Sequence, residues 1–320
     1  VLDGMPPGIE VDTVQIQRAL DRRRPGQSAL TSPRNEPDQI EILSGILNGK
    51  TLGTPIGFII RNRDQKSEDY AQLENTFRPG HADEAWQKKF GIRDHRGGGR
   101  SSARETACRV AAGAMARALL NQMGVEVSAY TSSVGEIELI EPCETLNLSD
   151  IDNSPVRCPH AATSDLMVKR IESARNEGDS VGGTITCVCK GVPASIGEPV
   201  FGKLHAWLSY GMLTIPASKG FEMLKGFENT QRMGSETNTF RDGVSGGIST
   251  GDPLVFRVAF KPVSSISREQ KMAAEGGAIK TLDIVGRHDP CVLPRAVPVV
   301  ESMALLVLAD FILINKTNTL

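Results

Sequence analysis

The sequence predicts an α+β protein that folds as a single large domain over residues 1–320. Residues 254–260 alternate between apolar and other side chains, which is typical of a half-buried antiparallel strand. Two long apolar segments, at about 103–123 and 295–314, have helical character, and each follows a loop that bears arginine. Because no low-complexity stretch or linker interrupts the chain, we expect one core rather than two separate domains.

The first third is expected to begin with a helix that is capped by Asp12 and stops at Pro25. Its last turn holds three arginines, at 22–24. Cations at a helix C-terminus complement the helix dipole, and three of them beside one loop also suit a small polyanion. A second helix is expected over 38–48, followed by a buried strand within 54–62.

A glycine turn leads into the first long helix, after a stretch over 76–95 that reads as mostly loop. The segment GGGRSSARET, at 97–106, places three glycines before a helix that we expect to begin near Ala103 and to end at Gly124. Ser102 and Glu105 have the spacing of a capping box. Glycine backbone and unpaired helix N–H groups together form a candidate cradle for phosphate or carboxylate, and a well-capped, glycine-hinged helix is the alternative.

The helix that follows has a centre of small side chains, AAGAMARA at 111–118, which indicates a core helix that another backbone approaches closely. The rest of the chain is expected to alternate between strands and helices. In order, we expect strands and turns over 126–152, a helix over 165–176, a strand over 180–192, a helix through 204–212, the strand over 254–260, a short strand before a polar loop at 286–291, and the closing helix.

Composition excludes several classes of protein. The formal net charge of −2 argues against a general nucleic-acid binder. The six cysteines show neither a disulfide framework nor zinc-ligand spacing, so we expect a reducing, cytoplasmic compartment and no metal; Cys187 and Cys189 are expected on one face of a strand. The apolar run 303–314 is shorter than a membrane span and contains Asp310, so we expect a buried helix and no membrane partner.

Seven short motifs, in order along the chain, make the sequence resemble the chorismate synthase family. They are RRRPG at 22–26, RPGHAD at 78–83, GGGRSSARET at 97–106, KGFE at 219–222, GGIS at 246–249, KPVSS at 261–265 and GRHDPC at 286–291. The resemblance covers essentially the whole chain, including a closing helix that is similar to the family's own.

The resemblance implies a fold, an activity and a cofactor. The fold is a sandwich of helices between antiparallel sheets, in a cytoplasmic homotetramer. The activity is a 1,4-anti elimination of phosphate from 5-enolpyruvylshikimate 3-phosphate (EPSP), which gives chorismate in the shikimate pathway to the aromatic amino acids. The family requires reduced FMN although the net reaction is redox-neutral; NADPH enters only as a remote source of reductant.

Site residues follow from the same resemblance. Arg23, Arg104 and Arg287 match substrate-binding arginines, whose guanidinium forks suit planar and tetrahedral oxyanions. His81 and Asp289 match residues that handle protons near the flavin. Ser102 matches a serine near flavin and substrate, but a capping role would use the same oxygen, so we assign it to binding first and to catalysis second. The implied FMN site comprises Arg100, Ser101, Ser102, Ala217, Gly246, Lys261, Pro262, Val263, Ser264, Ser265 and Arg287.

The sequence departs from the family pattern at three places. A GESHG segment with a further histidine should precede a start such as VLDGMPPG, so we expect a segment before Val1 that is missing here. The interval from Met233 to Gly246 is shorter than the family leads us to expect. Ala29 stands where many relatives have a basic residue, which puts one phosphate contact in doubt.

Two other functions fit parts of the pattern. A nucleotide-dependent phosphotransferase would read GGGRSS as a phosphate loop, but no GxxxxGK[ST] motif is present. An RNA-binding module would use RRRPG, but the net charge and the 5% of aromatic residues argue against it. A change in flavin absorbance on adding FMN and EPSP together separates these three functions.

Overall fold

The chain forms an α+β structure built on one main antiparallel sheet. The computed structural model describes residues 1–28, 30–32, 34–64, 70, 73–96, 99–238, 241–274, 277–283 and 289–318. The main sheet has five strands in the order β7 (Ile137–Glu138), β6 (Glu126–Val134), β8 (Gly183–Lys190), β12 (Leu254–Phe260) and β9 (Ser218–Met223). Its pairings are all antiparallel, and β8 and β12 run in register from Cys189 opposite Leu254 to Gly183 opposite Phe260. The alternation in the sequence thus predicted β12 correctly.

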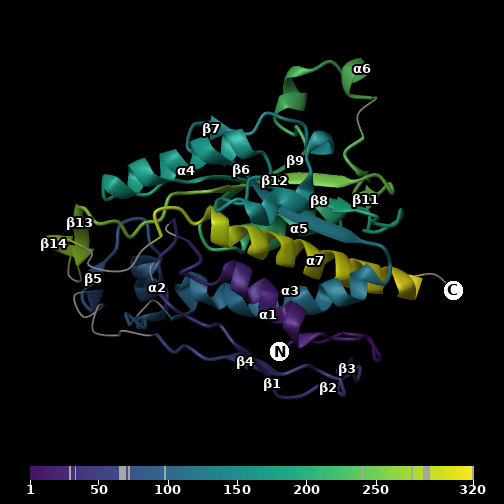
Figure 1. Cartoon of the computed structure of the whole chain (residues 1–320), viewed down its shortest axis with the longest axis horizontal. Helices are drawn as coiled ribbons and strands as arrows, with labels where there is room; N and C mark the ends of the chain where they lie inside the picture. Colours follow the sequence, from purple (N-terminus) through teal and green to yellow (C-terminus); the bar gives the residue numbers. More distant parts are fainter. Residues whose placement is uncertain are drawn as a thin grey trace.

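Helices fill the space between the main sheet and a smaller sheet, as Figure 1 shows. The helix α7 (Leu293–Asn318) packs on β6 and β8, and α3 (Thr106–Asn121) and α1 (Thr13–Arg23) pack in turn on α7. On their far side lies the antiparallel pair of β1 (Ile40–Ile42) and β4 (Phe58–Ile60). The sandwich of helices between antiparallel sheets is therefore confirmed.

The remaining elements surround this frame. Beside the sandwich are α2 (Asp83–Phe90), α4 (Ala161–Asn176), α5 (Leu204–Leu213) and the short α6 (Gly234–Thr237). Smaller sheets pair β2 (Ile46–Leu47) with β3 (Lys50–Thr51), β10 (Val244–Ser245) with β11 (Ile248–Ser249), and β13 (Glu269–Ala274) with both β14 (Ile279–Asp283) and β5 (Thr76–Phe77). Turns of 3₁₀ helix are η2 (Gly99–Ser101), η3 (Ala103–Glu105), η4 (Cys143–Thr145), η5 (Leu148–Asn153) and η6 (Glu228–Gln231). The helix α2 lies within the stretch expected to be mostly loop, so that expectation was wrong there.

The small residues of α3 allow α7 to cross it closely. A Cβ added at Gly113 would lie 2.3 Å from the Cβ of Ser302 and 2.6 Å from its Cα. Such distances are far inside van der Waals contact, so only glycine fits at this crossing. The sequence prediction of a core helix with a close backbone neighbour is confirmed.

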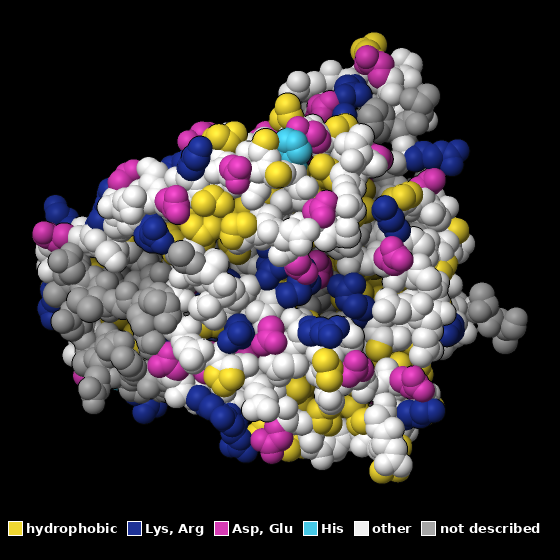
Figure 2. Space-filling view, in the orientation of Figure 1, with side chains coloured by type: hydrophobic (Ala, Val, Ile, Leu, Met, Phe, Trp, Pro, Cys, Tyr) yellow, Lys and Arg dark blue, Asp and Glu magenta, His cyan; other side chains and the backbone are white. Residues whose placement is uncertain are grey.

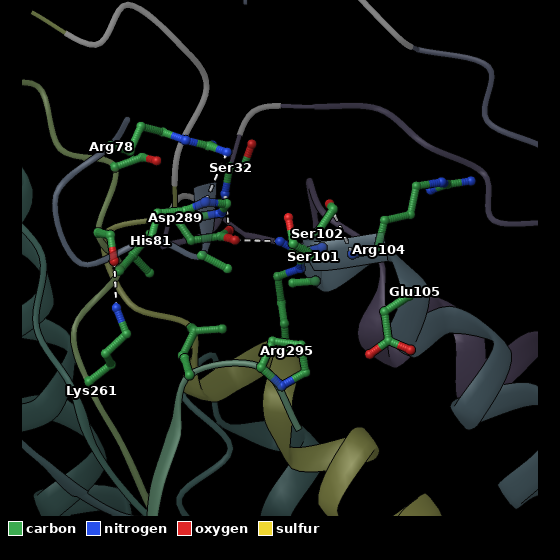
Figure 3. A pocket seen from close by; sticks show the side chains of 18 of the residues that line it. Ser32, Arg78, His81, Ser101, Ser102, Arg104, Glu105, Lys261, Asp289 and Arg295 are labelled. Atoms are coloured by element: carbon green, nitrogen blue, oxygen red, sulfur yellow. Dashed lines mark hydrogen bonds and ion pairs between the residues drawn. The ribbon is translucent and has the colours of Figure 1, made fainter. Parts of the chain in front are cut away.

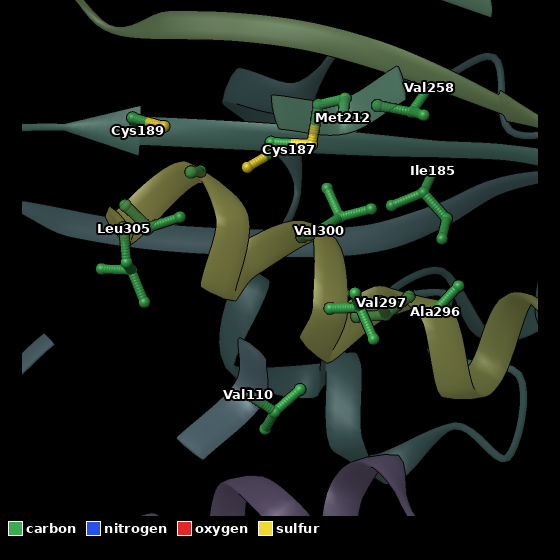
Figure 4. Close-up of a cluster of buried hydrophobic side chains, with 14 of the residues drawn as sticks. Val110, Ile185, Cys187, Cys189, Met212, Val258, Ala296, Val297, Val300 and Leu305 are labelled. Carbon is green, nitrogen blue, oxygen red and sulfur yellow. The ribbon is translucent and has the colours of Figure 1, made fainter. Parts of the chain in front are cut away.

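The core of the sandwich lies between β8 and α7. Figure 4 shows Cys187 and Cys189 on β8, with Val300 and Leu305 on the facing helix. Both cysteines are fully buried, and burial raises the pKa of the Cys187 thiol well above its ordinary value. As predicted, they are two side chains on one face of a strand.

One buried carboxylate joins four elements of the sandwich. Glu301 of α7 accepts hydrogen bonds from Arg22 Nη1 of α1 (2.6 Å), from Arg117 Nη2 of α3 (3.3 Å) and from the backbone N–H of Ala129 in β6 (3.1 Å). Burial opposes its charge, but the two arginines hold the pKa of Glu301 below its usual range. Part of the RRR cluster therefore serves the core rather than a ligand.

The helix expected over 38–48 is wrong, because this stretch forms β1 and β2. The backbone is left-handed at Asp38, Gly45 and Asn48 within it, and again at Gly49 directly after it. An α-helix cannot contain such residues in its interior. Leu43 and Leu47, which would share one face of such a helix, are 58% and 60% exposed.

The start of the first long helix also differs from expectation. Two 3₁₀ turns, η2 and η3, precede α3, which begins at Thr106 rather than near Ala103. Ser102 Oγ accepts a hydrogen bond from the N–H of Arg104 (3.3 Å), so it does cap the turn. Glu105 instead accepts from Arg109 Nε (3.2 Å), one turn further on, so the reciprocal half of the capping box does not form.

The closing helix is longer than its apolar centre suggested. With 26 residues, α7 is long and apolar enough to cross a membrane by composition alone, and 67% of its most apolar window is buried inside the protein. This burial is typical of the core helix of a soluble fold, which agrees with the expectation of a buried helix.

Candidate functional site

A cavity with a volume of about 750 Å³ lies where the C-terminal end of α1, the 3₁₀ turns before α3 and the N-terminal end of α7 meet. Figure 3 shows side chains from distant parts of the chain pointing into it. The residues that line it come from 23–25, 32–36, 70, 78–86, 100–109, 214–219, 261–265 and 289–295. Six motifs that the sequence singled out therefore contribute residues here: RRRPG, RPGHAD, GGGRSSARET, KGFE, KPVSS and GRHDPC.

The cavity is strongly cationic. Three carboxylates line it, Glu36, Glu105 and Asp289, against the nine cations Arg23, Arg34, Arg78, Arg100, Arg104, Arg109, Lys219, Lys261 and Arg295. On the molecular face in Figure 2, by contrast, Lys and Arg side chains alternate with Asp and Glu. The cavity therefore has an excess of positive charge that would attract an anionic ligand.

Two of the predicted substrate arginines are held by one buried carboxylate. Asp38 is fully buried, and it accepts hydrogen bonds from Arg23 Nη1 (2.9 Å) and from Arg104 Nη1 (2.6 Å). Arg23 also donates to Thr106 Oγ1 (3.1 Å) and to the carbonyl of Ala103 (2.7 Å). Burial, together with the nearby charge of Arg295, lowers the pKa of Arg23 to about 10.

These contacts divide the two arginines by accessibility. Arg23 has 3% of its side chain exposed, whereas Arg104 has 22%. Arg104 is therefore the more available of the two for a ligand, and Arg23 forms the rigid wall beside it.

Asp289 lies at the start of α7 and is held by two donors. Its Oδ1 accepts the backbone N–H of Ser32 (2.7 Å), and its Oδ2 forms an ion pair with Arg295. Arg295 Nε in turn donates to the carbonyl of Arg23 (3.1 Å), which joins the N-terminus of α7 to the C-terminus of α1. Both oxygens of Asp289 are thus oriented before any ligand binds.

The RPGHAD motif forms a compact ionic turn between β5 and α2. Asp83 accepts from Arg78 Nε (2.7 Å) and Nη2 (2.9 Å) and lies 2.8 Å from His81 Nδ1. Burial alone would raise the pKa of Asp83, but hydrogen bonds from Arg78 and His81 hold this pKa well below its usual range. Lys261 Nζ (2.7 Å) and Ser264 Oγ (2.8 Å) both donate to the carbonyl of Gly80, so the KPVSS segment holds this turn in place.

Most of the site residues that were predicted from the sequence line this cavity. The proposed residues that line it are Arg23, His81, Arg100, Ser101, Ser102, Arg104, Ala217, Lys261, Pro262, Val263, Ser264, Ser265 and Asp289. Gly246 does not line the cavity. This glycine lies in the turn between β10 and β11, where its backbone is left-handed. Arg287, Ala29 and the first two glycines of the candidate cradle, at 97 and 98, lie outside the described residues.

Sequence reasoning missed several charged residues of the cavity. Arg34, Arg109, Lys219 and Arg295 line it, and Asp38 organises two of its arginines. Lys219 lies within the KGFE motif and Arg295 opens the closing helix, so both had a sequence signal. Asp38 had none, because it was placed inside an expected helix.

Fold and site together define an α+β enzyme whose cavity is suited to a small polyanionic substrate. The chorismate synthase family model matches residues 1–313. Proteins named chorismate synthase from Christiangramia forsetii and Parabacteroides distasonis are each 52% identical over 99% of this chain, and the matches cover 92% and 93% of those proteins. A crystal structure of a chorismate synthase superposes with a TM-score of 0.75 at 27% identity, over 98% of this chain and 86% of that one. The chain belongs to the chorismate synthase family.

Its activity is that of the family. It is a lyase that removes phosphate from EPSP to give chorismate, in the biosynthesis of the aromatic amino acids. The family uses reduced flavin for this elimination.

Proposed function

We propose that the cationic cavity binds EPSP together with reduced FMN, within a cytoplasmic homotetramer. The observation that supports this most directly is the excess of nine cations over three carboxylates in one cavity of about 750 Å³. EPSP has a phosphate and two carboxylates, and FMN adds a second phosphate. A cavity that holds both therefore needs several fixed cations.

The residues present fit a flavin. The cavity volume lies within the roughly 300–1,000 Å³ of ligand pockets, and the wall combines apolar surface with polar groups. Ala217 has a left-handed backbone (φ 71°), which turns the chain at the edge of the cavity. We assign Ala217, Arg100, Ser101 and the segment 261–265 to the flavin side. When bound, the reduced flavin supplies transient electron density to the allylic carbon that loses phosphate.

We assign Arg104, Arg23 and Arg295 to the substrate side, with Arg287 retained from the resemblance. Arg104 reaches the cavity surface while its Nη1 is fixed by Asp38, so its fork is oriented before a ligand arrives. Arg100 and Lys219 line the same cavity and form no salt bridge with the described carboxylates, so their charges are available to phosphate.

Proton handling belongs to His81 and Asp289. His81 lines the cavity with 20% of its side chain exposed, and Asp289 stands on the same wall (Figure 3). His81 would hold or move a proton at the cavity side of its ring, and Asp289 would accept the substrate proton. Ser102 Oγ caps η3, so we assign it to binding before catalysis.

An anaerobic titration tests this proposal. Dithionite-reduced FMN is added to the full-length protein with and without EPSP, flavin absorbance reports binding, and chorismate absorbance reports turnover. We expect a flavin signal that is strengthened by EPSP. Arg104→Lys keeps the charge but loses the fork, and should raise the KM for EPSP about 5- to 150-fold, which corresponds to about 1–3 kcal/mol.

A matched control for Arg104→Lys is Arg61→Lys, which changes an exposed arginine whose side chain pairs with Glu41 on the surface. It should leave the KM for EPSP unchanged. A wild-type KM in Arg104→Lys would show that this arginine is not a substrate ligand, and a flavin signal that is indifferent to EPSP would contradict a shared cavity.

The reductant is expected from outside the chain. Reduced FMN would come from a separate reductase or a chemical reductant, with NADPH only as the remote electron source. Turnover with dithionite-reduced FMN and no NADPH is the expected result.

A further inference from the structure

We propose that Asp83 is a positioning residue that holds His81 in the tautomer with a proton on Nδ1, so that Nε2 is the ring nitrogen offered to the cavity. The structural part of this inference depends only on the contacts of the RPGHAD turn. Its consequence for turnover rests on the proposed role of His81.

His81 and Asp83 are in direct contact. His81 Nδ1 lies 2.8 Å from Asp83 Oδ1, a hydrogen-bonding distance. An ionised carboxylate only accepts hydrogen bonds, so the hydrogen between these atoms belongs to Nδ1. In a neutral imidazole with Nδ1–H, Nε2 has the free lone pair.

Asp83 stays ionised and fixed in place. Its side chain is 2% exposed, and three hydrogen bonds from Arg78 hold it: Nε at 2.7 Å and the backbone N–H at 3.2 Å to Oδ2, and Nη2 at 2.9 Å to Oδ1. A carboxylate with this many donors from one arginine keeps its negative charge and its orientation.

A second contact of His81 Nδ1, with Arg78, does not change this assignment. Arg78 Nη2 is also 3.1 Å from His81 Nδ1, and an arginine can only donate. If Nδ1 accepted from Arg78, it could not donate to Asp83, and the shorter contact of the two would lose its hydrogen. Arg78 Nη2 already has an acceptor in Asp83 Oδ1, so with Nδ1–H both Arg78 Nη2 and His81 Nδ1 donate to this carboxylate oxygen.

The burial of these side chains indicates which side of the His81 ring faces the cavity. Arg78 and Asp83 are both buried, whereas His81 lines the cavity and is partly exposed. The carboxylate therefore lies behind the ring, on the protein side, and the opposite ring nitrogen is left for a ligand. The same logic of a buried carboxylate behind a histidine orients the base of serine hydrolases.

The wild-type protein gives a direct test that needs no loaded cofactor. Two-dimensional ¹H–¹⁵N spectra of protein with ¹⁵N-labelled histidine distinguish the tautomers, and His81→Asn identifies the His81 signals among the five histidines. At a pH where His81 is neutral, we expect protonated Nδ1 and unprotonated Nε2. The opposite pattern in the wild-type protein would overturn the inference.

The variant Asp83→Asn sharpens the test. Its amide oxygen would stay with Arg78 Nε and the backbone N–H, which leaves the NH₂ group facing His81 Nδ1. Nδ1 must then accept, so the tautomer should reverse to Nε2–H. We expect kcat to fall about 10²-fold while the KM for EPSP changes much less, since a wrongly placed proton affects rate more than binding.

Glu84→Gln is the matched control. Glu84 is the next residue on α2, and it pairs with exposed Lys88 (2.7 Å). Its change to glutamine removes the same charge as Asp83→Asn does. In Glu84→Gln, the tautomer of His81 and the value of kcat should match those of the wild type. A retained Nδ1–H tautomer in Asp83→Asn would contradict the positioning role. If His81→Asn turns over normally, the proposed role of His81 fails instead, and the tautomer result still decides the inference.

Discussion

At the scale of residues, four cations of the cavity are positioned by carboxylates that are buried or nearly so. Asp38 holds Arg23 and Arg104, Asp289 pairs with Arg295, and Asp83 holds Arg78. A guanidinium group fixed in this way loses less entropy when it binds an oxyanion than a mobile surface side chain does. The acids of the site therefore contribute to anion binding although they have the wrong charge for it.

Asp38→Asn should weaken both folding and substrate binding. Arg23 and Arg104 bond to different oxygens of Asp38, so asparagine would keep only one of the two acceptors, and its NH₂ would face a guanidinium donor inside a site with no exposure. Breaking a buried ion pair costs about 3–5 kcal/mol, so we expect a loss of that size in the free energy of unfolding, measured in urea, and a raised KM for EPSP. Glu41→Gln, which removes an exposed pair with Arg61, should change stability by less than about 1 kcal/mol. Equal stability of the two variants would contradict a clamping role for Asp38.

Asp83 should make stability depend on pH on the acid side. Its pKa is lowered in the folded protein from an ordinary value of 3.8, so the folded state binds its proton less readily than the unfolded chain does. Its contribution is therefore fully present above pH 3.8 and is lost as the pH falls below it. We expect the difference in unfolding free energy between the wild type and Asp83→Asn to shrink from pH 6 toward pH 3. A constant difference over this range would show that the ion pair with Arg78 does not contribute.

At the scale of elements, the cavity exists because helix ends and turns meet at one end of the sandwich. The C-terminus of α1, the 3₁₀ turns before α3 and the N-terminus of α7 all reach it, and Arg295 ties α7 to α1 through the carbonyl of Arg23. Their relative placement depends on how closely α3 and α7 pack, which Gly113 determines.

Gly113→Ala should therefore be destabilising, although alanine is the better helix former. Its methyl group would lie 2.3 Å from the Cβ of Ser302, and the helices must separate to admit it. Overpacking of this kind costs about 1–3 kcal/mol, which outweighs the roughly 1 kcal/mol gained in helix propensity. Thermal unfolding should show a lower Tm. Gly234→Ala in α6, where nothing lies within 4 Å, provides the control and should leave Tm unchanged or slightly higher. A gain in stability for Gly113→Ala would show that the crossing can relax at no cost.

At the scale of the whole molecule, the proposed homotetramer predicts a particle of four times the 34.4 kDa chain. Light scattering coupled to size-exclusion chromatography measures this mass directly. The proposal that EPSP and FMN bind the folded state also predicts, by linkage, that saturating both ligands raises Tm. A monomeric mass that persists at all protein concentrations would contradict the proposed assembly without affecting the assignment of the cavity.

Local patterns in the sequence determined much of the structure. The Asp12 cap, the alternation in β12, the small residues of α3 and the apolar run of α7 each depend on neighbours along the chain, and each led to the observed element. The motifs also identified most of the cavity wall, because phosphate and carboxylate ligands call for arginine, lysine, serine and helix starts whatever the fold.

Only the tertiary structure decided what individual charged residues do. Arg22 and Arg23 are adjacent in one motif, yet Arg22 is committed to Glu301 in the core and Arg23 to the cavity wall, because neighbouring residues on a helix point in different directions. Asp38 was misread as helical, since its partners lie 15 and 66 residues away and its left-handed backbone leaves no periodic signal. Sequence pattern reports on local conformation and on the chemistry of side chains, whereas the pairing of buried charges depends on which distant elements the fold brings within about 3 Å of each other.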